Sequence, residues 1–116
     1  MTDQNCLFCS IVEGAIPAEV VHETENVLVF RDVGPQAPSH LLVIPKRHIA
    51  SLVEAGEDDR ELLGEVLLAA GHVARAEGVS EPGFRCVLNT GDDSGQTVHH
   101  LHMHVLGGRS MAWPPG

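Results

Sequence analysis

Half of the chain's eight histidines fall within one stretch of six residues, 99–104. Three of them alternate with apolar residues: His100, His102 and His104. Alternate side chains of a β-strand share a face, so the pattern predicts three imidazoles about 7 Å apart on one exposed face, with the intervening side chains turned toward a core. Those intervening residues are Leu101, Met103 and Val105. Each ring nitrogen needs a polar partner, and packing alone would favour valine here. We therefore interpret the three histidines as functional.

An imidazole that titrates near neutral pH can act as a metal ligand, a proton carrier or a nucleophile, and the spacing alone does not choose among these roles. The preceding turn, residues 91–97, narrows the choice. Its sequence, GDDSGQT, offers small residues and backbone N–H groups that can cradle an anion. The same residues would also make an ordinary hairpin loop. Beside a nucleophile, however, they predict a phosphate pocket.

The three cysteines are Cys6, Cys9 and Cys86, an odd and low count that argues against a disulfide framework. The Cys6-x-x-Cys9 pair is a candidate for metal binding or redox chemistry. It could equally supply two small apolar side chains to a first helix. Cys86 lies in an apolar stretch and is predicted to be a buried core thiol.

Hydrophobic periodicity predicts the elements that must position these groups. We expect strands at 19–22, 27–31, 40–44, 84–89 and 98–106, a short helix from residue 7 to about residue 14, and a long helix at 58–77. The long helix carries one apolar stripe: Leu62, Leu63, Val66, Leu67, Ala70, Val73 and Ala74. Strands, one long helix and further strands predict an α+β fold. Its mainly antiparallel five-stranded sheet would be covered on one face by the long helix.

Length and charge limit the function classes. A chain of 116 residues fits one domain, 1–116. Its 16 acidic and 7 basic residues give a formal charge of -9, which disfavours binding to nucleic acid but not to a single nucleotide. No run reaches the length of a membrane span. Met1 to Asn5 lacks the build of a signal peptide, so we expect a cytoplasmic protein.

The segment from His100 to Val105, HLHMHV, resembles the H-x-H-x-H-apolar signature of the histidine-triad (HIT) superfamily. The final residues 106–116, LGGRSMAWPPG, resemble the ending of its Hint branch. Further matches are IPA at 16–18, DVGPQAPSH at 32–40 and VIPKRH at 43–48. The resemblance covers nearly the whole chain and implies a HIT-like fold. Two positions depart from the familiar pattern. Thr97 replaces a serine, and His99 replaces an aromatic residue. By strand parity His99 faces away from the triad, and we interpret it as structural or surface.

The resemblance implies a homodimer that binds purine nucleoside monophosphates and hydrolyses purine nucleoside 5′-phosphoramidates. It implies that His102 attacks the α-phosphorus to give a nucleotidyl-histidine, that His104 contacts the phosphate or leaving group, and that His100 holds the neighbouring rings. Asp32 matches a ribose-binding position and Val33 lies beside the base. The phosphate-side positions are matched by Asn89, Gly95, Gln96 and Thr97. Trp113 matches a tail residue that reaches toward the partner subunit's site.

The resemblance also bears on metal binding. Some bacterial members of the superfamily bind zinc at positions that match four residues of this chain: Cys6, Cys9, His48 and His100. Such a Cys₂His₂ set would be structural, because four protein ligands leave no open position for water. No cofactor is expected to be required for catalysis.

Two other functions remain open from the sequence. One is a dinucleoside polyphosphate hydrolase or nucleotidyl transferase of the same superfamily, which the tryptophan-proline-proline ending disfavours. The other is a non-catalytic nucleotide-binding or zinc-binding module.

Overall fold

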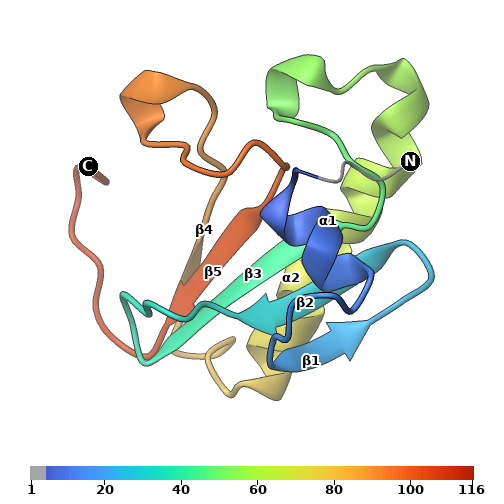
Figure 1. The fold of residues 1–116 in the computed structure, drawn as a ribbon. Coiled ribbons are helices and arrows are strands. Elements are labelled where there is room, and N and C mark those ends of the chain that lie inside the picture. Colours follow the sequence, from blue (N-terminus) through green and yellow to red (C-terminus); the bar gives the residue numbers. More distant parts are fainter. Residues whose placement is uncertain (1–4) are drawn as a thin grey trace.

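The computed structural model describes residues 5–116 (Figure 1). The interpretation of the N-terminus rests mainly on residues 1–4, which lie outside the described residues. The chain forms one five-stranded sheet in the order β1-β2-β3-β5-β4, and every neighbouring pair is antiparallel. A long helix packs behind the sheet and a short helix lies in front of it. The predicted α+β fold is therefore confirmed.

The strands are β1 Val20–Glu23, β2 Val27–Arg31, β3 Ser39–Pro45, β4 Phe84–Val87 and β5 Met103–Gly107. The α-helices are α1 Leu7–Val12 and α2 Arg60–Ala76, and three short 3₁₀ turns are η1 Leu52–Glu54, η2 Glu57–Asp59 and η3 Asp92–Ser94. Cys6 caps the N-terminus of helix α1, and its Sγ accepts the backbone N–H of Cys9. The first cysteine pair is thus fixed at the start of a helix.

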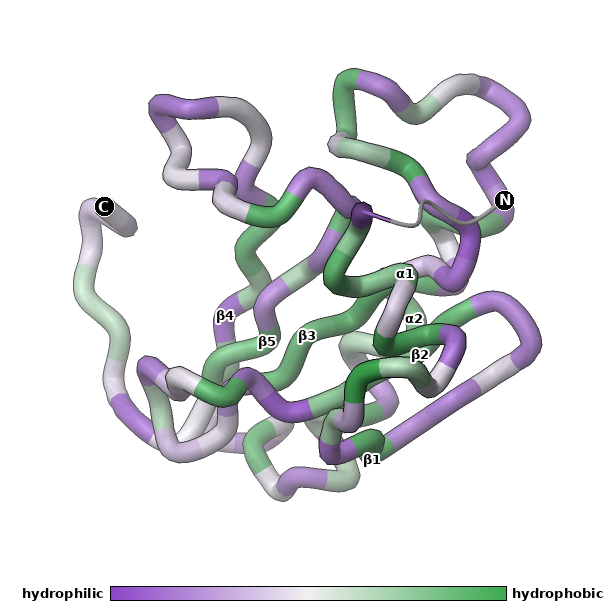
Figure 2. The backbone as a smooth tube through the Cα atoms, viewed as in Figure 1, coloured by the Kyte–Doolittle hydropathy of each residue, from purple (hydrophilic) through white to green (hydrophobic). Residues whose placement is uncertain are grey.

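The two faces of the sheet bury two different sets of apolar side chains. The α2 face packs alternate residues of the central strands against the helix: Val27, Val29, Leu41, Val43, Met103 and Val105. The α1 face buries the residues that point the other way: Leu28, Phe30, Leu42 and Ile44, packed with Cys6, Phe8 and Cys9. Strand β3 is apolar along nearly its full length, as the hydropathy colouring shows (Figure 2), because both of its faces are covered. Met103 and Val105 point to the α2 core, as predicted.

The predicted strand at 98–106 is wrong in its first half, because β5 begins only at Met103. The antiparallel pairing of β3 with β5 ends at Val43 and Met103. One residue further along β3 comes Ile44, followed by Pro45, which has no N–H to donate to a ladder. The chain leaves the sheet there, and the N–H of Leu101 donates instead to the carbonyl of Ile49 at 2.6 Å. Only His104 of the three alternating histidines therefore belongs to a strand.

Two side chains that the sequence predicted to be buried are exposed. Cys86 is exposed, because β4 is the outer strand of the sheet and its side chain points to the α2 side beyond the helix. Leu67, predicted in the apolar stripe, is 61% exposed. The buried side chains of α2 are Val66, Ala69, Ala70, Val73 and Ala74, so most of the predicted stripe is buried and its buried face extends to Ala69 instead of Leu67. Among residues 5–116, no helix combines the length and the apolarity that crossing a membrane requires.

Candidate active site

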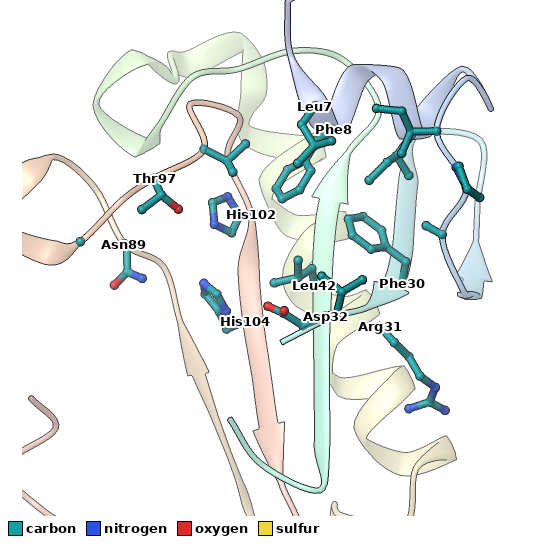
Figure 3. A pocket seen from close by; sticks show the side chains of 17 residues that line it. Leu7, Phe8, Phe30, Arg31, Asp32, Leu42, Asn89, Thr97, His102 and His104 are labelled. Carbon is teal, nitrogen blue, oxygen red and sulfur yellow. The ribbon is translucent and has the colours of Figure 1, made fainter. Parts of the chain in front are cut away.

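A cavity of about 460 Å³ opens on the α1 face of the sheet, between α1, the ends of β2 and β5, and the loop before β5 (Figure 3). One wall is apolar and includes Leu7, Phe8, Phe30 and Leu42. The opposite wall is polar and carries most of the residues singled out from the sequence: Asp32, Asn89, Gly95, Thr97, His102 and His104. An apolar slot with a few converging polar groups is the usual build of a small-molecule site. Val33 also lines the cavity, whereas Gln96, His100 and Trp113 are not among its lining residues.

The His102 ring lies at the edge of this cavity in a defined tautomer. Its Nδ1 is 2.7 Å from the carbonyl oxygen of His100, which can only accept, so the proton is on Nδ1. The ring is 6% exposed and packs edge-on against Phe8, with ring centroids 5.1 Å apart. The prediction of an exposed row of imidazoles is therefore wrong for His102, which is buried among side chains but lines the cavity. Its Nε2 carries an unshared electron pair, as a nucleophile requires.

His104 lies beside His102, with ring centroids 5.1 Å apart, and is held in the opposite tautomer by His40. The backbone N–H of Gln36 donates to His40 Nδ1 at 2.9 Å, so the proton of a neutral His40 is on Nε2. His40 Nε2 lies 2.8 Å from His104 Nδ1 and 3.4 Å from a carboxylate oxygen of Asp32. His104 Nδ1 therefore accepts, and the His104 proton is on Nε2. Of the two imidazoles that line the cavity, His102 therefore offers an electron pair on Nε2 and His104 offers an N–H on Nε2.

Asp32, His40 and His104 bring their ligand atoms within 4.8 Å of one another, a spacing that a metal ion could also use. The 2.8 Å separation of the two imidazole nitrogens is that of a hydrogen bond, and the Gln36 N–H leaves His40 only one nitrogen to donate with. We therefore interpret Gln36, His40 and His104 as a hydrogen-bonded chain that orients His104, with the Asp32 carboxylate close to His40.

Burial lowers the pKa of His104 to about 4, with the charges of His102 and His40 acting in the same direction and the Asp32 carboxylate opposing them. Burial also lowers the pKa of His40. Both rings are therefore neutral near pH 7, as their hydrogen bonds require.

This shift predicts a loss of stability in mild acid. The folded pKa of His104 is about 4 against an ordinary 6.5, so the unfolded chain takes up the proton first. Above pH 6.5 both states leave His104 neutral, so the free energy of unfolding does not depend on this group. As pH falls from 6.5 to 4, the free energy of unfolding falls by about 2 kcal/mol after allowance for partial solvent exposure. Urea unfolding of the wild type and His104→Gln at pH 7, 5.5 and 4.5 measures the difference. The difference in free energy of unfolding between the wild type and His104→Gln should shrink as pH falls. Parallel curves would contradict the shift, and His22→Gln is the matched control.

Asp32 is positioned by its neighbours at the end of β2. One carboxylate oxygen accepts the N–H of Gly34 at 2.8 Å, which leaves the other near His40 and the cavity. Arg31, next in the chain, points away from the cavity (Figure 3) and pairs through two nitrogens with the Glu77 carboxylate after α2, at 2.8 and 2.9 Å. This pair ties the end of β2 to the helix behind the sheet.

The turn at 91–97 forms a loop over the polar wall, but its N–H groups are not all free. Gly91 and Gly95 have φ of 82° and 89°, which only glycine adopts readily. The N–H of Gly95 donates to the carbonyl of Asp92 and that of Gln96 to the carbonyl of Gly91, so two N–H groups of the predicted phosphate pocket are already used within the turn. The Gln96 side chain instead stabilises the turn. Its amide oxygen accepts the N–H of Gly91, and its amide nitrogen donates to the carbonyls of Ala50 and Val98. Within residues 5–116, the Thr97 N–H has no hydrogen-bond partner and can donate to an anion.

A second cluster lies behind the polar wall and contains the four residues proposed from the sequence as metal ligands: Cys6, Cys9, His48 and His100. Their ligand atoms all lie within 4.8 Å of one another. His100 Nε2 is 2.8 Å from the carbonyl oxygen of Pro45, so it holds the proton, and the unprotonated Nδ1 faces the Cys6 and Cys9 sulfurs at 3.3 and 3.5 Å. His48 Nδ1 is 3.4 Å from the Cys9 sulfur. Two thiols and two imidazoles at these separations fit a tetrahedral zinc ion.

His100 is therefore not part of an exposed row, as the alternation predicted. It is fully buried, and its ring serves the cysteine cluster while its backbone carbonyl fixes His102. Burial also lowers its pKa, so it stays neutral near pH 7.

Trp113 lies on the C-terminal tail, away from the cavity of its own chain, and is 80% exposed. The Arg85 guanidinium lies 5.9 Å from the centre of the indole and donates to the carbonyl of Ala112 at 3.0 Å. The tail is thereby held along the outer strand β4, on the left in Figure 1.

The sequence patterns indicated no role for His40 or for the apolar wall of the cavity. His40 gave a weak signal, as the one histidine at the start of an otherwise apolar strand. The wall residues Phe8 and Phe30 gave none, because a buried aromatic side chain looks the same in sequence whether it lines a core or a cavity.

The chain is similar in sequence and in fold to known proteins of one family. Residues 13–111 match the family described as HIT domain. An uncharacterized HIT-like protein of Synechococcus elongatus is 53% identical over 113 residues, which cover 97% of this chain and 98% of that protein. The chain is also similar to the crystal structure of a HIT family hydrolase from Legionella pneumophila, with 56% identity, a TM-score of 0.95, and coverage of 97% of this chain and 100% of that one. A HIT family hydrolase from Clostridium thermocellum is 42% identical, with a TM-score of 0.93 and coverage of 96% of both chains.

Proposed function

The chain belongs to the HIT domain family, and from this premise we propose that it is a hydrolase that cleaves the P–N bond of purine nucleoside 5′-phosphoramidates. Two similar structures are named as HIT family hydrolases, which supports hydrolysis as the reaction class. The Hint-like ending of the sequence supports the phosphoramidate substrate. The observation that carries the proposal is the pair of imidazoles at the cavity, His102 with a free electron pair on Nε2 and His104 with a proton on Nε2.

The first step transfers the nucleotidyl group to the enzyme. The His102 Nε2 electron pair forms a bond to the α-phosphorus while the P–N bond of the substrate breaks. The bridging nitrogen of the substrate carries an extra proton, so its electron pair leaves with a neutral amine. His104 donates its Nε2–H to a phosphoryl oxygen and stabilises the charge there.

The second step releases the nucleotide. A water oxygen attacks the phosphorus, the bond to His102 breaks, and its electron pair returns to Nε2. One water proton passes to solvent and the other stays on the nucleoside monophosphate. The Nδ1–H bond to the His100 carbonyl holds the ring in one orientation through both steps.

The walls of the cavity suit a purine nucleotide. The base fits the apolar side between Phe8, Phe30 and Leu42, with Val33 at the rim. The Asp32 carboxylate oxygen that does not bind Gly34 accepts from the ribose hydroxyls, and Thr97 and Asn89 face the phosphate.

Asp32→Ala is predicted to weaken the binding of adenosine monophosphate about tenfold, because the loss of a charged hydrogen-bond acceptor costs about 1.5 kcal/mol. Isothermal titration against the wild type measures the change. Asp58→Ala, a change at an exposed carboxylate outside the cavity, is the control for net charge. Equal affinity for the wild type and Asp32→Ala would count against the ribose assignment.

The proposed chemistry is tested by trapping the intermediate. The wild-type protein is mixed briefly with an adenosine phosphoramidate, quenched under mildly alkaline denaturing conditions, and mapped by mass spectrometry. We expect one adenylyl group, on His102. An adduct on another residue, or turnover with none, would overturn the covalent mechanism. Comparing kcat/KM for the phosphoramidate and for a dinucleoside polyphosphate decides between the proposed substrate and the related hydrolase activity.

We also propose that the cysteine cluster holds a structural zinc ion. Cys6, Cys9, His48 and His100 supply four ligands, which would leave no open position for substrate or water. When bound, the ion would cross-link α1 to the segment that carries His102. The thiols require a reducing compartment, which supports a cytoplasmic location.

A homodimer completes the proposal. Strand β4 is an outer strand whose Phe84 is 37% exposed, and α2 exposes Leu67 at 61%. Apolar side chains at an uncovered sheet edge favour pairing with a second copy. The tail that carries Trp113 runs along this edge, so it would reach the partner's cavity. Sedimentation should give twice the 12.4 kDa of the chain, whereas Leu67→Glu should shift the protein toward the monomer.

A further inference from the structure

The metal-ligand cluster faces the surface on one side. Cys9 and His100 are completely buried, whereas Cys6 is 8% exposed and His48 is partly exposed. Cys6 and His48 line the same surface depression, which has a volume of about 280 Å³. Neither lines the nucleotide cavity. The two openings lie on opposite sides of Leu7 and the Thr97–Val98 segment, which line both of them.

His99 lines this depression beside Cys6 and His48, with its side chain exposed. Its neighbours in the cluster have fixed partners, since His100 donates to Pro45 and His48 contacts the Cys9 sulfur. Among residues 5–116, the His99 ring makes no hydrogen bond, ion pair or ring contact. An imidazole without a partner, next to a thiol and a second imidazole, is a group that can bind a metal ion without disturbing the fold.

A buried donor set has to receive its ion from water by stepwise exchange of ligands, and it needs a path of access. The only two ligands of this cluster that reach solvent do so in the depression that His99 lines. We propose that this depression is the passage by which a zinc ion reaches and leaves the cluster, and that His99 is the first ligand of the incoming ion. This inference rests on the proposed metal site. It assigns His99 a kinetic role in metal exchange and no role in holding the ion at equilibrium.

The test measures zinc transfer with the full chain. Wild type, His99→Phe and His99→Ala are loaded with one equivalent of Zn²⁺, and the release of zinc to excess chromogenic chelator is followed by stopped flow. Reloading of the metal-free proteins with Zn²⁺ is measured as well. His99→Phe keeps a ring of similar size without a ligand nitrogen, and His72→Phe is the matched change at another exposed histidine.

We expect loading and release in both His99 variants to slow about tenfold, the effect of about 1.4 kcal/mol on each barrier. The zinc stoichiometry and dissociation constant should be unchanged, and His72→Phe should match the wild type. Equal rates in the wild type and His99→Phe would overturn the role of His99 while leaving the metal site intact. Faster release in His99→Ala would also overturn it, since His99 would then be a plug. Failure of the wild type to bind zinc would overturn the metal site and the passage together.

Discussion

Replacing His102 by alanine is expected to lower kcat/KM for an adenosine phosphoramidate by about 10⁴-fold or more, because the group that forms the covalent bond is gone. Nucleotide binding should largely survive. The ribose and base contacts assigned to Asp32 and to the apolar wall do not involve the His102 ring. The nucleotidyl adduct should be absent from the variant. Turnover and adenosine monophosphate binding are measured on the same preparation.

A second substitution keeps this test independent of folding. The His102 ring is buried against Phe8, so His102→Ala leaves a space that lowers stability. His102→Asn fills part of that space, and its amide N–H can still donate to the His100 carbonyl, but it offers no nucleophilic nitrogen. Both variants should be equally inactive at a temperature where circular dichroism shows them folded. Near-normal turnover in either one would remove His102 from the role of nucleophile.

Removal of the metal should lower the thermal midpoint of unfolding by about 10 °C. Ligand binding to the folded state alone adds directly to its stability, and about 3 kcal/mol corresponds to that shift in a chain of this size. The loss has a structural reason. Without the ion, the contacts that join Cys6 and Cys9 at the start of α1 to His48 and His100 are weak hydrogen bonds. Calorimetry of zinc-loaded and chelator-treated protein measures the difference.

The cysteines supply matched controls for this prediction. Cys9→Ser should melt at the temperature of the chelated wild type, and chelator should not lower it further. Cys86→Ser removes an exposed thiol outside the cluster and should keep the full response to chelator. Hydrolysis by the chelated protein, assayed well below its midpoint, should remain measurable because no ligand position is open for substrate. Equal midpoints with and without chelator would contradict a structural ion.

Much of this fold could be predicted from the sequence because its elements carry strong local patterns. The apolar strand at 40–44 and the helix at 58–77 follow directly from hydrophobic periodicity. Periodicity failed where tertiary contacts decide the outcome. The alternating histidines continued the pattern of a strand, yet the pairing of β3 with β5 stops near Pro45. The chain leaves the sheet there, and the His100 side chain lies against the cysteines. Cys86 has apolar neighbours in sequence, but its strand lies at the edge of the sheet.

The candidate site was predicted less completely than the fold, because its chemistry depends on which atoms meet. The sequence pointed to the residues that line the cavity, His102 and His104 among them. It did not show that His40 sets the tautomer of His104, a contact between residues 64 positions apart. Nor did it show that the N–H groups of Gly95 and Gln96 are already used within their own turn. A list of residue types does not reveal which donors remain unpaired.

The buried ring of His100 has a consequence for how substitutions in the triad are interpreted. Its ring contacts the cysteines and its backbone carbonyl accepts the Nδ1–H of His102, so a substitution there disturbs both the cysteine cluster and the position of the nucleophile. A drop in turnover after His100→Ala would therefore say little about whether the histidine takes part in chemistry. Only comparison with a cysteine variant, which disturbs the same cluster from its far side, can separate a direct effect from a lost anchor.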